Sequence, residues 1–165
     1  MELQHSTLEG SKNTDQIITF KIADEEYGLE ILRVKEVIQL KEVTKLPKTP
    51  QWVKGIINLR GDVIPVIDLR KKFGIKDKKV DAGRVIVVEV EKKSMGMLVD
   101  SVSHVIRIEN DQIDSMPLFG GSTGSYVRGV AKLGDRLIVL INIDKVLTTE
   151  EKIDLQRLKE QSKVA

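Results

Sequence analysis

The side chains that could act as nucleophile, base and acid are few, and they lie apart in the sequence. A Ser-His-Asp arrangement would combine His104 and Asp100 with Ser122 or Ser125, because such a hydrolase needs a base beside its nucleophile. No G-x-S-x-G motif surrounds either serine, and both lie in a glycine- and serine-rich stretch typical of a flexible connection. The pattern favours a protein that is not an enzyme, with a small hydrolase as the weakest alternative.

Metal and phosphate sites have as little support. The two histidines, His5 and His104, are far apart, and the chain has no cysteine, so neither a zinc pattern nor a disulfide is predicted. The G-G-S-T-G run at residues 120–124 lacks the lysine and the strand-to-helix setting of a phosphate-binding loop. We therefore expect no metal and no cofactor.

The most specific binding feature is an arginine at the tip of a predicted β-hairpin. Residues 52–69, W-V-K-G-I-I-N-L-R-G-D-V-I-P-V-I-D-L, have the pattern of two apolar strands that meet at a tight turn around Gly61. Asn58 and Arg60 stand beside this glycine, which can take a positive φ, so the hairpin would present one guanidinium at a defined place. Because an arginine at a hairpin tip contributes little to a hydrophobic core, Arg60 is interpreted as a residue that recognises a binding partner.

Composition indicates a globular domain that meets partners through patches. Apolar residues make up 41% and charged residues 32% of the 165 residues, and 27 basic side chains nearly balance 25 acidic ones. This balance argues against a nucleic-acid footprint over the whole surface. The one dense basic run, residues 70–79, is expected to be a solvated face, and a chain with one Trp, two Tyr and three Phe has no stacking platform beside it. A basic module that binds nucleic acid stays open as an alternative function.

An internal duplication organises the elements that position these residues. With an offset of 74, residues 52–69 align with residues 126–143 without a gap. With an offset of 68, residues 17–38 align with residues 85–106. Each copy is a unit of short predicted strands and glycine-marked turns, a size suited to a small barrel.

The two copies differ where side chains are expected to be exposed. Arg60 aligns with Gly134 and therefore has no counterpart, and Glu36 aligns with His104. Scaffold positions match in a duplication, whereas binding positions need not. Such differences are what an adaptor with two unlike faces would need.

The predicted segments follow the duplication. Within the first copy, residues 29–40 are expected to form a short helical turn that runs into a strand. Thr148 and Glu151 have the spacing of a capping box at the start of a short charged helix. The expected divisions are a mobile N-terminal tail, a first barrel, a second barrel, and a C-terminal helix and tail: residues 1–14, 15–80, 81–147 and 148–165.

Three runs of the sequence resemble the bacterial chemotaxis coupling proteins of the CheW family. They are E-E-Y-G-L-E-I-L-R-V-K-E-V at residues 25–37, K-G-I-I-N-L-R-G-D-V-I-P-V-I-D-L-R at residues 54–70 and G-D-R-L-I-V-L-I-N-I-D-K-V-L at residues 134–147. The resemblance covers about residues 15–150, and its N-L-R-G turn is fairly specific. It implies an all-β fold of two SH3-like five-stranded β-barrels, with short helices that include a C-terminal one. It also implies a non-catalytic adaptor in chemotaxis signal transduction.

The resemblance further implies partners and a place in the cell. The partners would be the cytoplasmic helices of methyl-accepting chemoreceptors and the regulatory domain of the histidine kinase CheA, with no nucleic acid and no direct membrane insertion. The polar residues 1–16 contain no apolar segment of a secretory signal, so we expect a cytoplasmic protein. It would be recruited to receptor arrays at the inner face of the membrane.

The resemblance also implies which residues face the receptor, because the family's motif can be matched position by position to this chain. The implied receptor-binding residues are Val34, Glu36, Gly55, Asn58, Arg60, Gly61, Val102 and Val105. The valines have an alternative explanation as core residues, and the glycines as turn residues. The kinase-binding residues stay unknown. The kinase's regulatory domain resembles the same fold, so the two proteins would contact each other through the ends of their barrels.

Overall fold

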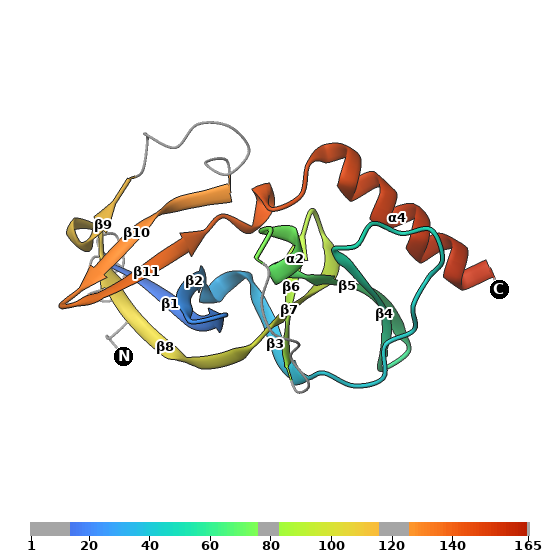
Figure 1. Ribbon diagram of the computed structural model, residues 1–165, viewed down its shortest axis with the longest axis horizontal. Helices are drawn as coiled ribbons and strands as arrows, with labels where there is room; N and C mark the ends of the chain where they lie inside the picture. Colours follow the sequence, from blue (N-terminus) through green and yellow to red (C-terminus); the bar gives the residue numbers. More distant parts are fainter. Residues whose placement is uncertain (1–13, 76–82, 116–125, 165) are drawn as a thin grey trace, which may run out of the picture.

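The computed structural model describes residues 14–75, 83–115 and 126–164, which are mostly β-strand (Figure 1). The first repeat provides β1 (Thr14–Ile22), β2 (Glu25–Glu30), β3 (Val34–Gln39), β4 (Val53–Leu59) and β5 (Asp62–Asp68). The second provides β6 (Arg84–Val90), β7 (Lys93–Val99), β8 (Ser101–Glu109), β9 (Ile113–Asp114), β10 (Val127–Leu133) and β11 (Arg136–Ile141). The helical segments are η1 (Ile31–Arg33), α2 (Leu69–Lys72), η2 (Asn110–Gln112), η3 (Ile143–Lys145) and α4 (Thr149–Val164).

The strands form two sheets that lie side by side along the long axis in Figure 1. One sheet has five strands in the order β3-β6-β7-β5-β4. The other has the order β8-β1-β2-β11-β10-β9, in which the two-residue β9 is the sixth strand. The predicted all-β fold with a pair of small barrels and short helices is therefore confirmed. The predicted turn leading into a strand at residues 29–40 is also confirmed, as η1 followed by β3.

The expected barrel boundaries, residues 15–80 and 81–147, do not match the sheets. The first two strands of each repeat pair in the sheet that holds the later strands of the other repeat: β1 and β2 join β8–β11, and β6 and β7 join β3–β5. The physical reason is that η1 turns the chain out of the six-stranded sheet after β2, and a bend at Asp100 turns it back after β7. Each barrel is thus built from both repeats, which exchange their first hairpins.

Equivalent pairings join the repeats on both sides of the molecule. The antiparallel pairs β1 with β8 and β3 with β6 correspond to each other, as do the parallel pairs β2 with β11 and β5 with β7. Leu140 is in register with Gly28, and Val66 with Gly96, at matching positions of the duplication. The duplication seen in the sequence is therefore also a duplication of hydrogen-bonding pattern.

A glycine in each repeat makes room for this arrangement. A Cβ atom on Gly28 would lie 2.6 Å from Cγ2 of Ile17 and 3.0 Å from Cδ2 of Leu140, and one on Gly96 would lie 2.7 Å from Cγ1 of Val85. Ile17, Leu140 and Val85 are all at most 1% exposed, so they have little space to move. Only a residue without a side chain fits where three strands converge on each barrel interior.

Three apolar clusters stabilise the fold. The interior of the six-stranded barrel contains Ile17, Ile108 and Ile138, and that of the five-stranded barrel contains Ile64 and Val85. A third and larger cluster lies between the barrels and draws on both repeats, with the following buried members among others: Phe20, Leu29, Ile67, Ile86, Met97, Ile141 and Leu155. This cluster is the largest of the three, so the two repeats meet through an apolar interface.

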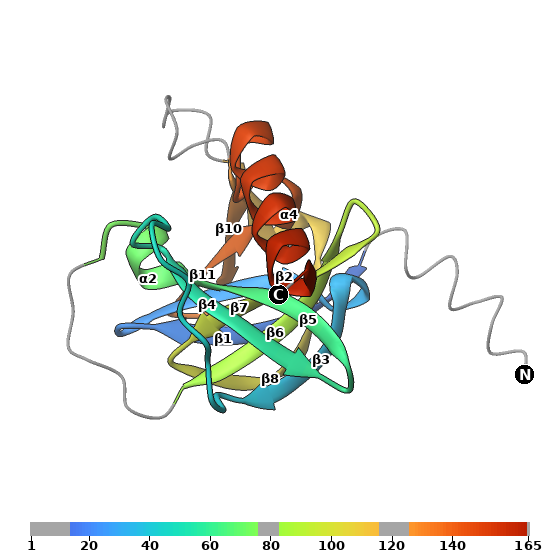
Figure 2. The same cartoon turned by 90° about the vertical axis from the view of Figure 1, so that its right-hand side faces the viewer.

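The C-terminal helix α4 lies over β5, on the upper side of the molecule in Figures 1 and 2. Its predicted capping box is confirmed: Glu151 N donates to Thr148 Oγ1 at 3.1 Å, and Thr148 N donates to Glu151 Oε1 at 2.9 Å. Glu151 also pairs with Lys72 at 2.7 Å, and Leu155 is buried in the central cluster. Among the described residues, no helix is long and apolar enough to cross a membrane.

Gly28→Ala should destabilise the protein by about 2 kcal/mol, because the added methyl overpacks a closed barrel interior. For a chain of this size, that corresponds to a Tm lowered by about 4–8 °C in a thermal melt. Gly134→Asn is the matched control: Gly134 has φ +61°, nothing lies within 4 Å of its added Cβ, and asparagine tolerates this φ. An unchanged Tm for Gly28→Ala would contradict the close convergence of β1, β2 and β11.

Candidate protein-binding face

The β4–β5 hairpin presents Arg60 as the sequence predicts. Arg60 and Gly61 form the two-residue turn with φ values of 54° and 87°, the pattern of a type I′ hairpin. Asn58 holds this turn, since its Oδ1 accepts a hydrogen bond from Gly61 N at 2.8 Å. The left-handed φ of Arg60 is unusual for a residue with a side chain, so the turn fixes the direction in which the guanidinium leaves the hairpin.

Arg60 has a partner within the fold, which the sequence did not indicate. Its Nη1 donates to Oε1 of Glu36 at 3.3 Å, and its Nη2 donates to Oε2 of the same carboxylate, so the pair is bidentate. Glu36 belongs to β3 and Arg60 to the β4–β5 turn, and β3 and β4 are the two edge strands of the five-stranded sheet. The pair therefore links the two edges of this barrel.

The Arg60–Glu36 pair combines an exposed cation with a more sheltered anion. The side chain of Arg60 is 70% exposed, whereas that of Glu36 is 29% exposed. The hydrogen bond from Arg60 lowers the pKa of Glu36 below its ordinary value, so this carboxylate stays ionised further into the acid range than an unpaired glutamate. Sequence reasoning expected Arg60 to have little to do for the fold, but the structure gives it a structural partner as well as exposure.

The valines of the predicted site lie on two equivalent edge strands. Val34 on β3 and Val102 on β8 are half-buried and pack against the central cluster, whereas Val105 on β8 is 46% exposed. Val37 on β3 is 37% exposed and is the counterpart of Val105 in the duplication. Sequence analysis did not place Val37 in the site, although its alignment with Val105 was the signal that could have done so.

Gly55 is explained by the fold alone. It has φ +148° at a bulge in β4, and an added Cβ would lie 2.3 Å from the carbonyl oxygen of Thr44. That carbonyl accepts from Ile56 N at 2.9 Å and so pairs the preceding connection with β4. The structure thus brings Glu36, Asn58, Arg60 and Gly61 together at the hairpin tip, while Gly55 serves the strand.

The candidate hydrolase residues have structural contacts. The carboxylate of Asp100 accepts from Ala23 N at 2.8 Å and from Arg70 Nη1 at 3.3 Å. His104 exchanges backbone hydrogen bonds with the hydroxyl of Thr19. The two serines considered for a triad lie outside the described residues, and no group of three or more His, Asp or Glu side chains within the described ranges is placed to hold a metal.

The basic run after β5 is not simply a solvated face. Arg70 and Lys72 have side chains only 11% and 17% exposed, and they pair with Asp100 and Glu151. The ammonium of Lys72 also lies 4.8 Å from the ring centroid of Trp52. The expectation was wrong for these two residues, because α2 begins at the buried Leu69 and its short turn directs them towards neighbouring elements. The later lysines of the run lie outside the described residues.

Two joined SH3-like barrels with an exposed hairpin arginine and half-exposed valines define a protein-binding scaffold. Residues 16–151 match the family model of the CheW-like domain. The chain belongs to the CheW family, and its role is that of a chemotaxis scaffold.

Similar proteins agree with this assignment over most of their length. The chemotaxis protein CheW of Klebsiella aerogenes is 36% identical over 148 residues, covering 88% of this chain and 89% of that protein. CheW of Helicobacter pylori is 36% identical over 152 residues, covering 88% and 92%. The crystal structure of the scaffolding protein TtCheW from Thermoanaerobacter tengcongensis superposes with a TM-score of 0.76 at 40% identity, covering 83% of this chain and 94% of that one.

The Arg60–Glu36 pair should make stability depend on pH in the acid range. The pKa of Glu36 is lowered in the folded state, so its contribution is present above the unfolded value of 4.5 and is lost as the pH falls through the folded value. Wild type should therefore melt slightly higher than Glu36→Gln at neutral pH, and the two melting curves should converge as the pH falls below 4.5. A difference that persists unchanged in strong acid would contradict this linkage.

Proposed function

We propose that this chain couples transmembrane chemoreceptors to the histidine kinase CheA without catalysis. In this proposal, the cytoplasmic helices of a methyl-accepting receptor dock on one face of the scaffold, and the kinase's regulatory domain meets barrel ends. The chain is recruited in this way to receptor arrays at the inner face of the membrane. The receptor contact is assigned to the face formed by β3 and β8, called here the β3/β8 face.

The observation that carries the proposal is the position of the two half-exposed valines. β3 is the edge strand of one sheet and β8 that of the other, and both lie on the lower side of the molecule in Figures 1 and 2. Val37 and Val105 are exposed on these strands, while Val34 and Val102 pack inward against the central cluster. An apolar strip supplied by both barrels suits one face of an amphipathic helix, which presents aliphatic side chains every three or four residues.

Arg60 and Glu36 give this apolar strip a polar boundary. Glu36 directly precedes Val37 on β3, an edge strand, so in this proposal the pair flanks the helix position. The exposed guanidinium has donors left over after its bidentate contact with Glu36, because an arginine carries five N–H groups. A carboxylate or carbonyl of the receptor can therefore be bound by Arg60 while Glu36 keeps the side chain in place.

The kinase contact is assigned to the barrel ends by fold similarity alone. Two SH3-like modules can join through the ends of their barrels, where hairpin turns leave apolar side chains at the surface. Leu137, at the start of β11, is 62% exposed and lies beside the β10–β11 turn. Such a contact would use a different surface from the β3/β8 face, as a scaffold that holds two partners requires.

Arg60→Glu should weaken binding of a purified receptor cytoplasmic fragment at least about tenfold, the loss typical of a hot-spot arginine. It should keep Tm within a few degrees, because the side chain is exposed, and should largely retain affinity for the CheA regulatory domain. Isothermal titration calorimetry with each partner measures both affinities. Normal receptor binding by Arg60→Glu would remove Arg60 from the receptor contact.

Two further variants separate a receptor contact from a purely structural pair. The double variant Glu36→Arg, Arg60→Glu restores opposite charges across the barrel edge, so its recovery of full receptor binding would show that the pair acts only through the fold. We expect it to remain weak. Arg136→Glu is the matched control, because Arg136 near the other hairpin tip also pairs with a carboxylate, that of Glu26 at 2.8 Å, and should leave receptor binding unchanged.

A further inference from the structure

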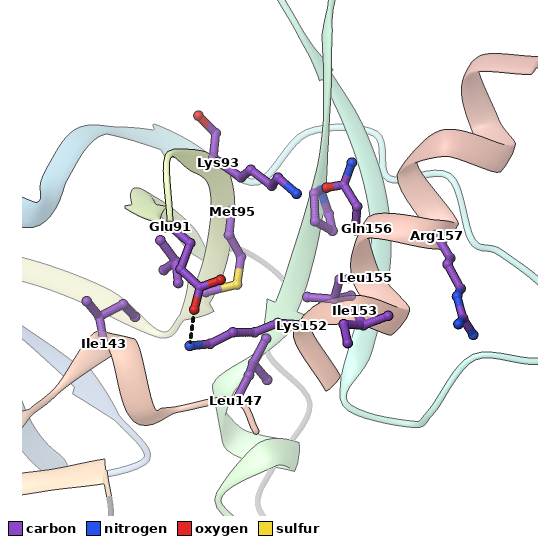
Figure 3. A pocket seen from close by; sticks show the side chains of 13 residues that line it. Glu91, Lys93, Met95, Ile143, Leu147, Lys152, Ile153, Leu155, Gln156 and Arg157 are labelled. Carbon is purple, nitrogen blue, oxygen red and sulfur yellow. Dashed lines mark hydrogen bonds and ion pairs between the residues drawn. The ribbon is translucent and has the colours of Figure 1, made fainter. Parts of the chain in front are cut away.

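A groove separates α4 from the tip of the β6–β7 hairpin. Neither the receptor contact nor the kinase contact proposed above involves this groove. Its volume is about 330 Å³, at the lower end of the range for binding sites. Figure 3 shows its two walls: Glu91, Lys93 and Met95 come from the hairpin region, and Lys152, Ile153, Leu155, Gln156 and Arg157 come from α4. The groove is therefore formed between the C-terminal helix and a hairpin of the second repeat.

The floor of this groove is apolar and partly open. Met95 and Leu155 are 5% and 6% exposed, and they continue directly into the central cluster. Ile153, at the lip, is 48% exposed, although it is a large aliphatic residue on the side of α4 that borders the groove. A half-exposed isoleucine that lines the same groove as a buried methionine provides a surface that an incoming aliphatic side chain would cover.

The charges around the groove are mainly positive. Lys152 Nζ is paired with Glu91 at 2.9 Å across one part of the groove, which neutralises both. Lys93 extends over the groove towards Gln156 in Figure 3, and within the described residues it has no ion-pair partner. The side chain of Arg157 is 71% exposed, and its ion pair with Asp154 is long, at 4.0 Å. Lys93 and Arg157 are therefore two cationic groups at the rim that can form ion pairs with carboxylates of a partner.

We propose that this groove binds an acidic amphipathic segment of a partner protein. Its aliphatic side chains would cover Ile153 and reach towards Met95, and its carboxylates would pair with Lys93 and Arg157. The partly open form suits side chains projected from a backbone that stays outside, whereas a small ligand usually needs burial of most of its surface. Net positive charge at the rim selects acidic segments over basic ones.

The groove and the β3/β8 face can be occupied at the same time. α4 lies on the upper side of the molecule in both Figures 1 and 2, whereas β3 and β8 lie on the lower side. The groove is therefore a separate attachment point, and its occupancy does not depend on whether the β3/β8 face binds a receptor.

The test is a titration of the full-length protein, labelled at methionine methyl groups, with a synthetic peptide that has leucines at helical spacing and glutamates between them. Met95 lines the groove, whereas Met97 is fully buried in the central cluster, so the two methyl signals are a reporter and an internal control. We expect the Met95 signal to shift with a dissociation constant on the order of 100 µM, and the Met97 signal to stay in place.

Adjacent lysines provide the matched variants. Lys93→Glu reverses a rim charge and should weaken binding about fivefold or more, and Ile153→Ser should weaken it by removing apolar contact. Lys92→Glu changes the neighbouring exposed lysine, which does not line the groove, and should have less than a twofold effect, since exposed charges that lack direct contact are screened by salt.

Four results would overturn the proposal. They are a Met95 signal that does not move with millimolar peptide, an equal shift with a peptide carrying lysines in place of the glutamates, equal effects of Lys93→Glu and Lys92→Glu, and a shift with decanoate but not with peptide. The last result would assign the groove to a fatty-acid chain. The position of the Met97 signal in each variant shows that the fold is kept.

Discussion

The structure depends on two short parallel pairings in which the repeats hold each other. β2 pairs with β11 and β5 with β7, in the same register at Gly28 and Gly96. Each pairing joins a first hairpin of one repeat to the last strand of the other, so neither repeat contains a complete barrel. Because both barrels need both repeats, the chain is one cooperative unit, although its sequence reads as two copies.

This exchange also explains why the largest apolar cluster lies between the barrels. The hairpins that cross over carry buried residues on both faces, one face towards a barrel interior and the other towards the shared cluster. Aromatic rings from both repeats pack in series there. Phe20–Tyr27 and Phe73–Tyr126 are stacked, with centroid distances of 5.9 Å and 4.6 Å, and the tilted pair Tyr27–Phe73 joins them at 5.7 Å. A rigid interface of this kind fixes β3 and β8 relative to each other, which a binding face supplied by two barrels requires.

The duplication kept the scaffold and allowed the surface to diverge. Asp68 N donates to the carbonyl of Trp52, and Asn142 N to that of Tyr126, both at 2.8 Å and at equivalent positions. At the hairpin tips, by contrast, Arg60 has a bidentate carboxylate partner, whereas its counterpart is a glycine. The helix α4 lies outside the duplication altogether, so one wall of the groove beside it belongs to neither repeat.

The sequence by itself determined the strands, the duplication, the hairpin tip and the helix cap, because periodicity, turn residues and capping act over a few neighbouring positions. It predicted that Arg60 is exposed, but it missed Glu36 as its partner, since 24 positions separate them and only the curvature of the barrel brings them together. The sequence also suggested a barrel boundary at residue 80, whereas each barrel takes strands from both sides of that position. Local similarity reveals that two segments are alike, whereas hydrogen bonding between distant strands decides which segments share a sheet, and only the tertiary structure contains that pairing.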